Sequence, residues 1–369
     1  MMKEDFFWYW LTNIDGIGRG SVRKLIESFG SPDMVYDAPD EMVCNLLRTG
    51  QQRENFKKSK NKDSIRKGLQ KLSDLQISYM HTDSYSYPLR LRQIPDPPYS
   101  LYLQGKMPAK DQKAVAVIGA RNCTRYGEEM AKFFGRELAK CGIAIISGLA
   151  RGIDGMAHIG ALEGGGYTLG VVGGGIDQIY PKENYNLFIQ MKERGGILSE
   201  NNIGVKPAAG LFPLRNRLIA GLCDGILVVE AMEKSGTFIT VDQGLEQGKE
   251  IFALPGRMTD KKSAGCNNLI KLGAHIVTEV SDILQILGIE YNYKETIKDF
   301  GFSGQKNQKM SLAPQEKMVY SCLEIEPKHI DCIIYEAKLA PQDVSRILNE
   351  LAIRGVITET NRNYYAIIV

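Results

Sequence analysis

Residues able to hold an anion occupy a strand-to-helix turn in the middle of the chain, Ser147-Gly148-Leu149-Ala150-Arg151-Gly152-Ile153-Asp154. An apolar run at 143–146 precedes this turn, and a helical pattern follows it. The free N–H groups of a helix start, the positive end of its dipole and a guanidinium would converge there on one phosphate or carboxylate. The alternative is that Gly148 and Gly152 only permit the turn, while Arg151 pairs with Asp154. The octapeptide by itself leaves both interpretations open.

The segment that contains this turn, about 114–287, repeats a short apolar strand, a glycine-bearing turn and a helix. Near-continuous apolar strands that alternate with helices predict a doubly wound, mostly parallel sheet covered on both faces. In such α/β sheets ligands bind beyond the carboxyl ends of the strands. The predicted strands are 114–118, 143–146, 168–172, 196–199, 225–229, 250–254 and 275–277.

Basic residues recur in the turns that would meet along this edge of the sheet. A common groove lined by cations would suit a phosphate backbone. The five residues expected to line it are Arg121, Arg151, Lys182, Arg215 and Arg217.

Aromatic residues are interleaved with these cations at Tyr180, Tyr185 and Phe212. Cations with aromatic stacking platforms are typical of proteins that bind single-stranded nucleic acid. For Tyr180 and Phe212, ordinary packing is the alternative. The first strand is followed by Gly-Ala-Arg-Asn-Cys-Thr rather than Gly-x-Gly-x-x-Gly, and a Gly-x-x-x-x-Gly-Lys-Ser/Thr motif is absent from the chain. The pattern therefore argues against a dinucleotide or nucleoside triphosphate site.

Residues for catalysis or metal binding are sparse. The acids near the turns lack the spacing of metal ligands, and the seven Cys contain no Cys-x-x-Cys pair. We expect Asp154 and Asp177 to accept bonds from backbone N–H groups, and His158 to be packed on its helix. The sequence thus predicts no catalytic residue, no metal and no cofactor. The scattered cysteines fit a reducing cytoplasm, and no apolar run is long enough for a membrane span.

The flanks of this segment carry their own signals. Residues 13–20, Asn-Ile-Asp-Gly-Ile-Gly-Arg-Gly, precede a helical pattern and resemble a helix-hairpin-helix turn, which either approaches a DNA phosphate or only connects two helices. Between 51 and 71 the net charge is +6, which favours either a polyanion or a solvated helix face. Three helical patterns at 314–323, 329–337 and 341–354, followed by a strand pair at 356–368, predict a winged helix. That module would contact DNA or a protein.

The length of 369 residues and these composition changes predict several domains. We expect a helical helix-hairpin-helix or SAM-like domain with an extended connector at 1–112, the sheet domain at 113–288, a linker at 289–311 and the winged helix at 312–369.

Seven motifs of the middle segment resemble, in their order, those of the DNA processing protein A family, DprA or Smf, which acts in natural transformation. They are 117–121, 147–154, 180–184, 198–200, 212–217, 229–237 and 255–267.

The resemblance implies a cytoplasmic, homodimeric, Rossmann-like protein without enzymatic activity that binds incoming single-stranded DNA, protects it and helps to load the recombinase RecA. Carried over by motif, Arg121 and Lys182 are the main phosphate contacts, and Tyr185 and Phe212 stack on bases. The other expected phosphate-binding residues are Ser147, Gly148, Arg151, Asn184, Arg215, Asn216 and Arg217.

The alternative function is enzymatic. The middle segment also resembles the lonely-guy phosphoribohydrolases, which act on nucleoside monophosphates through a Gly-Gly-x-Gly-Thr-x-x-Glu loop. The corresponding loop here is 234–240, in which Thr240 replaces the catalytic Glu. This replacement counts against hydrolysis.

Overall fold

A computed structural model describes residues 3–290 and 312–367 of the chain. The fold divides into two compact units, one formed by 1–122 and 131–283 and the other by 123–130 and 284–369. Most of the linker predicted at 289–311 lies outside the described residues.

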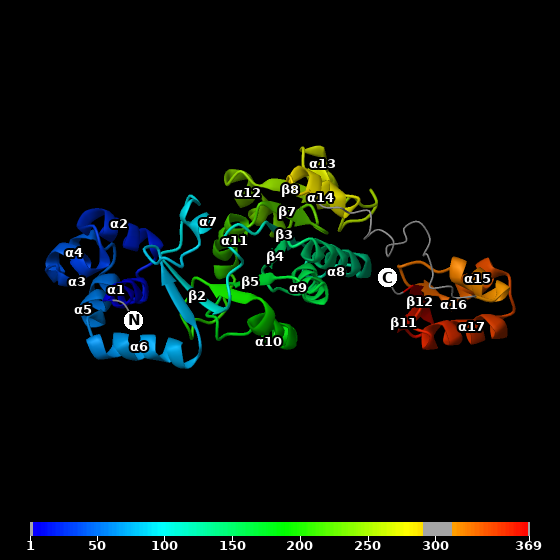
Figure 1. Cartoon of the computed structure of the whole chain (residues 1–369), viewed down its shortest axis with the longest axis horizontal. Helices are drawn as coiled ribbons and strands as arrows, with labels where there is room; N and C mark the ends of the chain where they lie inside the picture. Colours follow the sequence, from blue (N-terminus) through cyan, green and yellow to red (C-terminus); the bar gives the residue numbers. More distant parts are fainter. Residues whose placement is uncertain (1–2, 291–311, 368–369) are drawn as a thin grey trace. The chain divides into compact units, whose positions relative to one another are not determined.

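A nine-stranded sheet forms the centre of the first unit, in the order β1-β2-β6-β5-β4-β3-β7-β8-β9 (Figure 1). The strands β3 to β9 run parallel to one another and match the seven predicted strands to within one residue at each end. The doubly wound, mostly parallel sheet is therefore confirmed. Its strands are β1 Ser78–His81, β2 Ser100–Gly105, β3 Ala114–Ile118, β4 Ala144–Ser147, β5 Thr168–Val172, β6 Gly196–Ser199, β7 Gly225–Val228, β8 Glu250–Ala253 and β9 His275–Ile276.

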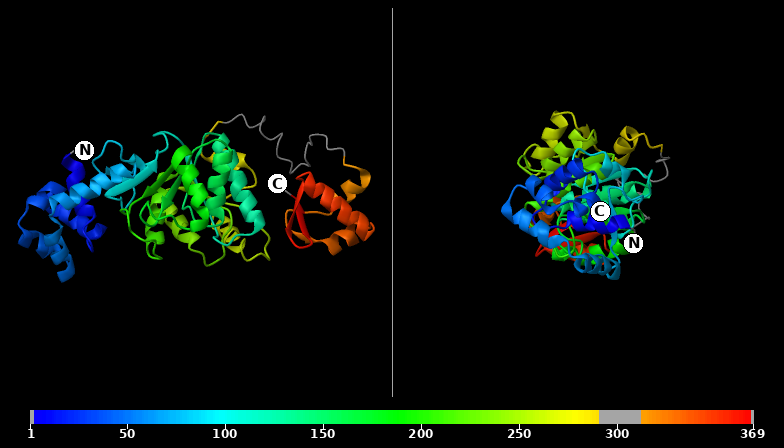
Figure 2. Two further views of the ribbon diagram at one scale, coloured as in Figure 1. Left: turned by 90° about the horizontal axis from the view of Figure 1, so that it is seen from below. Right: turned by 90° about the vertical axis from the view of Figure 1, so that its left-hand side faces the viewer.

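The strands β1 and β2 were not predicted, because their residues fall in the passage expected to be an extended connector. They pair with each other antiparallel, and β2 pairs antiparallel with β6, with Tyr102 opposite Ser199. The buried Tyr102 hydroxyl also accepts a hydrogen bond from Asn13 Nδ2 at 2.9 Å. The N-terminal helices therefore share a core with the sheet, and β2, drawn in cyan, runs between them and the green strands (Figure 2).

Helices cover both faces of the sheet (Figure 1). The crossovers after β3, β4 and β5 put α8 to α10 on one face, while α7 and α11 to α13 cover the other. At Gly160 an added Cβ would lie 2.0 Å from the carbonyl oxygen of Lys132, so α9 approaches α8 at a distance that only glycine allows. The bounds are α7 Leu89–Arg92, α8 Arg125–Lys140, α9 Ile153–Glu163, η1 Lys182–Asn184, α10 Tyr185–Arg194, α11 Leu211–Leu222, α12 Thr237–Glu246, α13 Ala264–Lys271 and α14 Val280–Ile286.

Six helices precede the sheet, and a glycine turn joins the first two. The carbonyl oxygens of Asp15 and Gly16 in this turn accept hydrogen bonds from the side chains of Asn55 and Gln52 at 2.9 and 2.8 Å. These contacts hold the turn against α5, as in a packed connector. The helices are α1 Lys3–Thr12, α2 Arg19–Phe29, α3 Pro32–Asp37, α4 Asp40–Leu46, α5 Gly50–Ser59 and α6 Lys62–Asp74.

The described C-terminal residues, 312–367, contain the three helices and the strand pair that the sequence predicts. A further short strand extends the pair to a three-stranded sheet in the order β10-β12-β11. Buried Val319, Ile333 and Leu348 bring the helices onto this sheet. The elements are α15 Pro314–Ser321, β10 Lys328–His329, α16 Ile330–Ala337, α17 Pro341–Ile353, β11 Ile357–Asn361 and β12 Tyr364–Ile367.

Two features are absent from the part of the chain that the structure describes. None of its helices combines the length and the hydrophobicity needed to cross a bilayer. Its His, Cys, Asp and Glu side chains do not gather in groups of three that would hold a metal ion.

Candidate functional site

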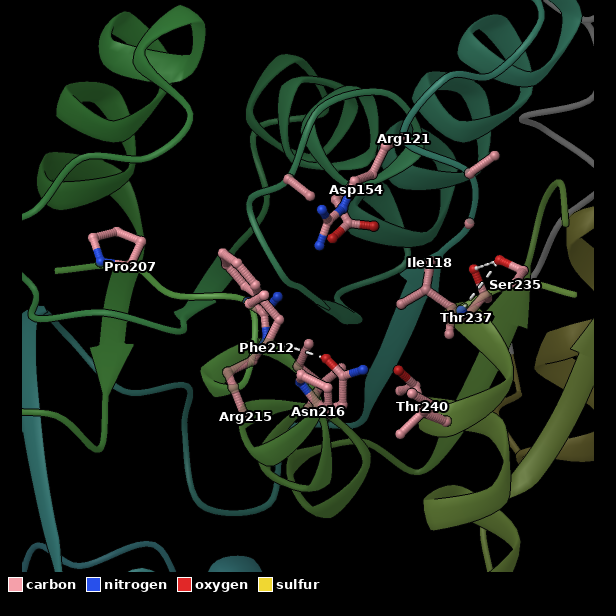
Figure 3. A pocket seen from close by; sticks show the side chains of 18 of the residues that line it. Ile118, Arg121, Asp154, Pro207, Phe212, Arg215, Asn216, Ser235, Thr237 and Thr240 are labelled. Atoms are coloured by element: carbon pink, nitrogen blue, oxygen red, sulfur yellow. Dashed lines mark hydrogen bonds between the residues drawn. The ribbon is translucent and has the colours of Figure 1, made fainter.

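A pocket of about 630 Å³ lies at the carboxyl ends of β3 and β7. From β3 the chain builds β4, β5 and β6 on one side of the sheet and then returns to build β7, β8 and β9 on the other, so the pocket lies at the topological switch point. The turn after β3, the start of α11 and the start of α12 line it. Figure 3 shows the labelled side chains around the opening: Arg121, Asp154, Phe212, Asn216, Ser235, Thr237 and Thr240.

Arg121 is the exposed cation of this pocket. Its guanidinium carbon lies 5.1 Å from the centre of the Phe212 ring, within the range of a cation–π contact. The Phe212 ring in turn packs against Tyr180, with the ring centres 5.8 Å apart. The aromatic pair thus holds the exposed guanidinium group of Arg121 beside the pocket.

Arg215 is the second cation of the pocket, and it is buried. Its Nη1 donates to the carbonyl oxygen of Gly148 at 2.7 Å and to that of Val171, and its Nε donates to Asn216 Oδ1 at 3.2 Å. Burial lowers the pKa of Arg215 to about 10, an effect that the nearby Asp154 opposes. The side chain therefore ties α11 to the turn after β4 and to β5 itself, and it adds positive charge to the pocket wall.

Asp154 supplies a buried carboxylate directly beside Arg215. Its Oδ2 accepts a hydrogen bond from the backbone N–H of Gly148 at 3.1 Å. Burial raises the pKa of Asp154, whereas the Arg215 charge and the backbone donors lower it. The expectation that Asp154 accepts from backbone N–H groups is confirmed, and so is that for Asp177, which accepts from Gly204 at 2.8 Å.

The pairing of Arg151 with Asp154 is wrong. The exposed Arg151 guanidinium instead forms an ion pair with Glu183, which is also exposed. Asp154 is already engaged by Gly148 and Arg215, and its burial leaves no route to a side chain on the outer surface of the turn.

Asn184 fixes the same turn from the other side. Its Nδ2 donates to the carbonyl oxygens of Leu149 and Ala150, both at 3.0 Å. Leu149 adopts a left-handed conformation with φ at 56°, which these bonds help to hold. Lys182 and Tyr185 flank Asn184 and are exposed, at the start of η1 and of α10, but they do not line the pocket.

Two of the predicted phosphate-binding side chains point elsewhere. Ser147 is fully buried and donates to the carbonyl oxygen of Val117 at 2.6 Å, so its hydroxyl is not free for a ligand. Arg217 is also buried, forms an ion pair with Glu200 and lies 3.6 Å from Asp96. Positions 215 and 217 are about 200° apart around a helix, so the two arginines face opposite sides of α11. The expectation that all five cations line one groove is therefore wrong for Arg217.

Of the predicted residues, four line the pocket together: Arg121, Phe212, Arg215 and Asn216. Gly148 lies against Arg215, with an added Cβ only 2.6 Å from its Nη2. Lys182, Arg151 and Tyr185 are on neighbouring turns outside the lining.

Sequence reasoning noted the loop 234–240 but did not assign its residues to the binding site. Thr240 is 97% buried and lines the pocket, and Ser235 Oγ accepts a hydrogen bond from Thr237 N–H at 3.2 Å. The signal was present in Ser235-Gly236-Thr237, a polar glycine turn that leads from β7 into α12. His158 is packed, as expected: its Nδ1 lies 2.6 Å from Thr168 Oγ1, and burial lowers its pKa to about 3.

Known proteins resemble both the sequence and this geometry. The sequence model of the family described as DNA recombination-mediator protein A matches residues 78–288. The protein Smf of Synechocystis sp. is 30% identical over 97% of this chain and 97% of its own. The X-ray structure of DNA processing protein A from Streptococcus pneumoniae has 30% identity and a TM-score of 0.68, over 79% of this chain and 100% of that one.

A third relative is described by the ligand that it binds. It is the DNA processing protein A of Helicobacter pylori, described for its single-stranded DNA binding mode, with 31% identity and a TM-score of 0.51 over 57% of this chain and 95% of that one. The match of the family model begins at the first residue of β1 and covers the whole sheet that positions the pocket. On its sequence and its fold, the chain belongs to the DNA recombination-mediator protein A family, also called DprA or Smf.

Proposed function

We propose that the pocket at the carboxyl ends of β3 and β7 binds single-stranded DNA through its phosphates and an exposed aromatic surface. The observation that carries this proposal is Arg121, an exposed guanidinium stacked on Phe212 at the switch point of the sheet. A related family member is described by its single-stranded DNA binding. Because bases stack on aromatic rings only when they are unpaired, a single strand fits this arrangement better than a duplex.

The further contacts follow from the turns beside the pocket. Lys182 provides an exposed ammonium, and Tyr185 is 54% exposed one turn further along. Arg215, Asn216, Gly148 and Asn184 hold the wall and the adjoining turn in place. We assign the phosphate contacts to Arg121 and Lys182, base stacking to Tyr185 and Phe212, and a lesser contact to Arg151.

The cellular role is proposed on family membership. The chain would act in the cytoplasm as a homodimer during natural transformation, protect incoming single strands and help to load RecA. In this proposal residues 1–112 carry the N-terminal helices and lend β1 and β2 to the sheet, 113–288 bind the strand, 289–311 are a linker and 312–369 form a winged helix. RecA-driven strand exchange with and without the full chain tests the loading step.

Binding is tested with fluorescently labelled single and double strands and the full chain. Arg121→Ala and Lys182→Ala should each weaken single-strand binding by about 1 to 3 kcal/mol, as expected for the loss of a charge-assisted hydrogen bond. Lys271→Ala removes an exposed cation from α13 and should bind like the wild type. The logarithm of affinity should fall by about 0.7 per released counterion for each tenfold rise in salt. Unchanged binding by a folded Arg121→Ala protein, or equal affinity for single and double strands, would refute the assignment.

The side chains of the pocket do not support the alternative function of a phosphoribohydrolase. The position of its catalytic Glu holds Thr240, and the nearest pocket carboxylate, Asp154, is bonded to Gly148 and faces Arg215. Incubation with nucleoside monophosphates should therefore release no free base.

A further inference from the structure

The N-terminal helices α5 and α6 carry a second concentration of positive charge, away from the pocket residues. Residues 51–71 contain eight Lys or Arg and two acids. Three of the cations have partners: Lys58 pairs with Glu54, Lys60 pairs with Asp40, and Arg53 donates to the carbonyl oxygen of Leu47. The other five are exposed and form no ion pair within the described residues: Lys57, Lys62, Arg66, Lys67 and Lys71.

The arrangement of these cations opposes the stability of α6. Lys62 and Arg66 are four residues apart, as are Lys67 and Lys71, and like charges at this spacing repel each other. Lys62 is also the first residue of the helix, where the dipole disfavours a positive charge. The two acids of α6 offset only part of this charge: Asp63 complements the dipole in the first turn, and Asp74 accepts from Gln70 at 2.9 Å, against four cations. The helix thus keeps a surplus of positive charge that its own stability does not require.

The burial of the apolar side of α6 argues for a nucleic acid, and against an anionic membrane surface, as the partner of these cations. Ile65, Leu69 and Leu72 are buried in the core that α6 shares with α1, so the helix presents no apolar face to a bilayer. An interfacial membrane helix needs such a face beside its cations. The exposed face of α5 and α6 instead offers charge alone, which is what a phosphodiester backbone requires.

The helix α17, which stands where a winged helix usually reads DNA, differs from α5 and α6 because its arginine is paired with acids. Arg346 of α17 lies 2.9 Å from Glu350 and 3.9 Å from Asp343, and Arg354 lies 3.1 Å from Glu316. Arg346, the cation of α17, is therefore paired, whereas α5 and α6 together carry five unpaired cations.

We propose that the five unpaired cations of α5 and α6 form a second DNA-backbone site, separate from the Arg121 pocket. It would hold either a duplex or the single strand that continues beyond the pocket. Both present the same phosphates, and neither needs an unpaired base at this face. Because charge alone holds the DNA, the complex is expected to be weaker than that of the pocket and to be lost first as salt rises.

The test compares two full-length variants that each lack three positive charges. Lys62→Gln/Arg66→Gln/Lys67→Gln neutralises three cations of α6, and Lys106→Gln/Lys110→Gln/Lys271→Gln neutralises exposed residues elsewhere. The probes are a duplex of about 20 base pairs and single strands of about 40 and about 6 nucleotides, the last just long enough for the pocket. The α6 variant should bind the duplex, the long strand or both at least about tenfold more weakly, with a salt slope smaller by up to about 3.

The outcomes are distinguishable. Loss with the duplex alone identifies a duplex site, and loss with the long strand alone identifies an extension of the pocket track. Unchanged affinity for both, or an equal loss in the control variant, would overturn the proposal. Lys62→Arg/Lys67→Arg, which keeps the charge, should bind like the wild type, and a loss there would mean that the helix and not its charge matters. Arg121→Ala should weaken the short strand and leave duplex binding intact, so failure of the pocket and failure of this surface are measured separately.

Discussion

Gly148→Ala should destabilise the fold from inside the pocket wall. An added Cβ would lie 2.6 Å from both Arg215 Nη2 and Asp154 Oδ2 and 2.8 Å from Arg215 Nη1. All three atoms belong to buried groups, so neither side chain can move into solvent without losing its partners. The methyl group must therefore separate the guanidinium from the carbonyl oxygens of Gly148 and Val171 that it bridges.

The magnitude follows from those contacts. A hydrogen bond from a charged group contributes about 1.5 to 3 kcal/mol, and leaving one partner of a buried ion pair alone costs about 3 to 5 kcal/mol. The two losses overlap, because both arise from displacement of Arg215, so we expect the free energy of unfolding to fall by about 3 to 5 kcal/mol. For a domain of this size that is a drop of roughly 10 °C in Tm.

Urea and thermal unfolding followed by circular dichroism measure the effect. Gly20→Ala is the matched control: Gly20 lies in the exposed part of α2, and its added Cβ meets nothing within 4 Å. Alanine should stabilise that helix by about 0.5 to 1 kcal/mol. If Gly148→Ala lowers the free energy of unfolding by less than about 1 kcal/mol, the proposed contact between Arg215 and the Gly148 turn is refuted.

Three further predictions concern the neighbouring residues. Glu183→Gln releases Arg151 from its ion pair and should raise single-strand affinity about two- to fivefold in fluorescence anisotropy; unchanged or weaker binding would contradict a contact by Arg151. Tyr185→Ala should weaken single-strand binding by about 1 to 3 kcal/mol while Tyr185→Phe binds normally, and equal loss in both would indicate a hydroxyl contact instead of stacking. His158 has a folded pKa of about 3, below its unfolded value, so the unfolded chain takes up the proton first and stability falls as pH drops below about 6.5. Between pH 6.5 and 5 this group should remove about 2 kcal/mol, and an NMR titration showing His158 charged at pH 5 would exclude that origin.

The sequence predicted the sheet well because its inner strands are continuously apolar. Residues 114–118 and 144–147 are buried along their whole length. Such continuous apolar runs differ from the alternating apolar and polar residues of a strand that is exposed on one face. The strands β1 and β2 were not predicted, because a proline-rich passage separates them. They also pair antiparallel at one end of the sheet, where no strand–helix repeat marks them. The strand with which β2 pairs, β6, lies about a hundred residues further along the chain.

The candidate site was predicted by position but not by side-chain direction. The sequence places Ser147 at a strand end, yet its hydroxyl turns inward to Val117. Arg215 and Arg217 are two residues apart and were expected to act together, whereas the helix sends them to opposite sides. The pairing of Arg151 with Glu183 joins residues 32 positions apart. Such contacts depend on how two turns approach each other, which local pattern does not specify.

The β1–β2 pair has a consequence for where the chain can be cut. A shortened protein that starts at residue 113 would lose β2 and leave the backbone of β6 without its outer partner. Ile197 and Leu198 of β6 are fully buried, so their strand would become an unprotected apolar edge that favours aggregation. A cut before residue 78 keeps both strands and coincides with the start of the family match. The shortest fragment expected to keep the sheet intact therefore begins at Ser78, before the first parallel strand at Ala114.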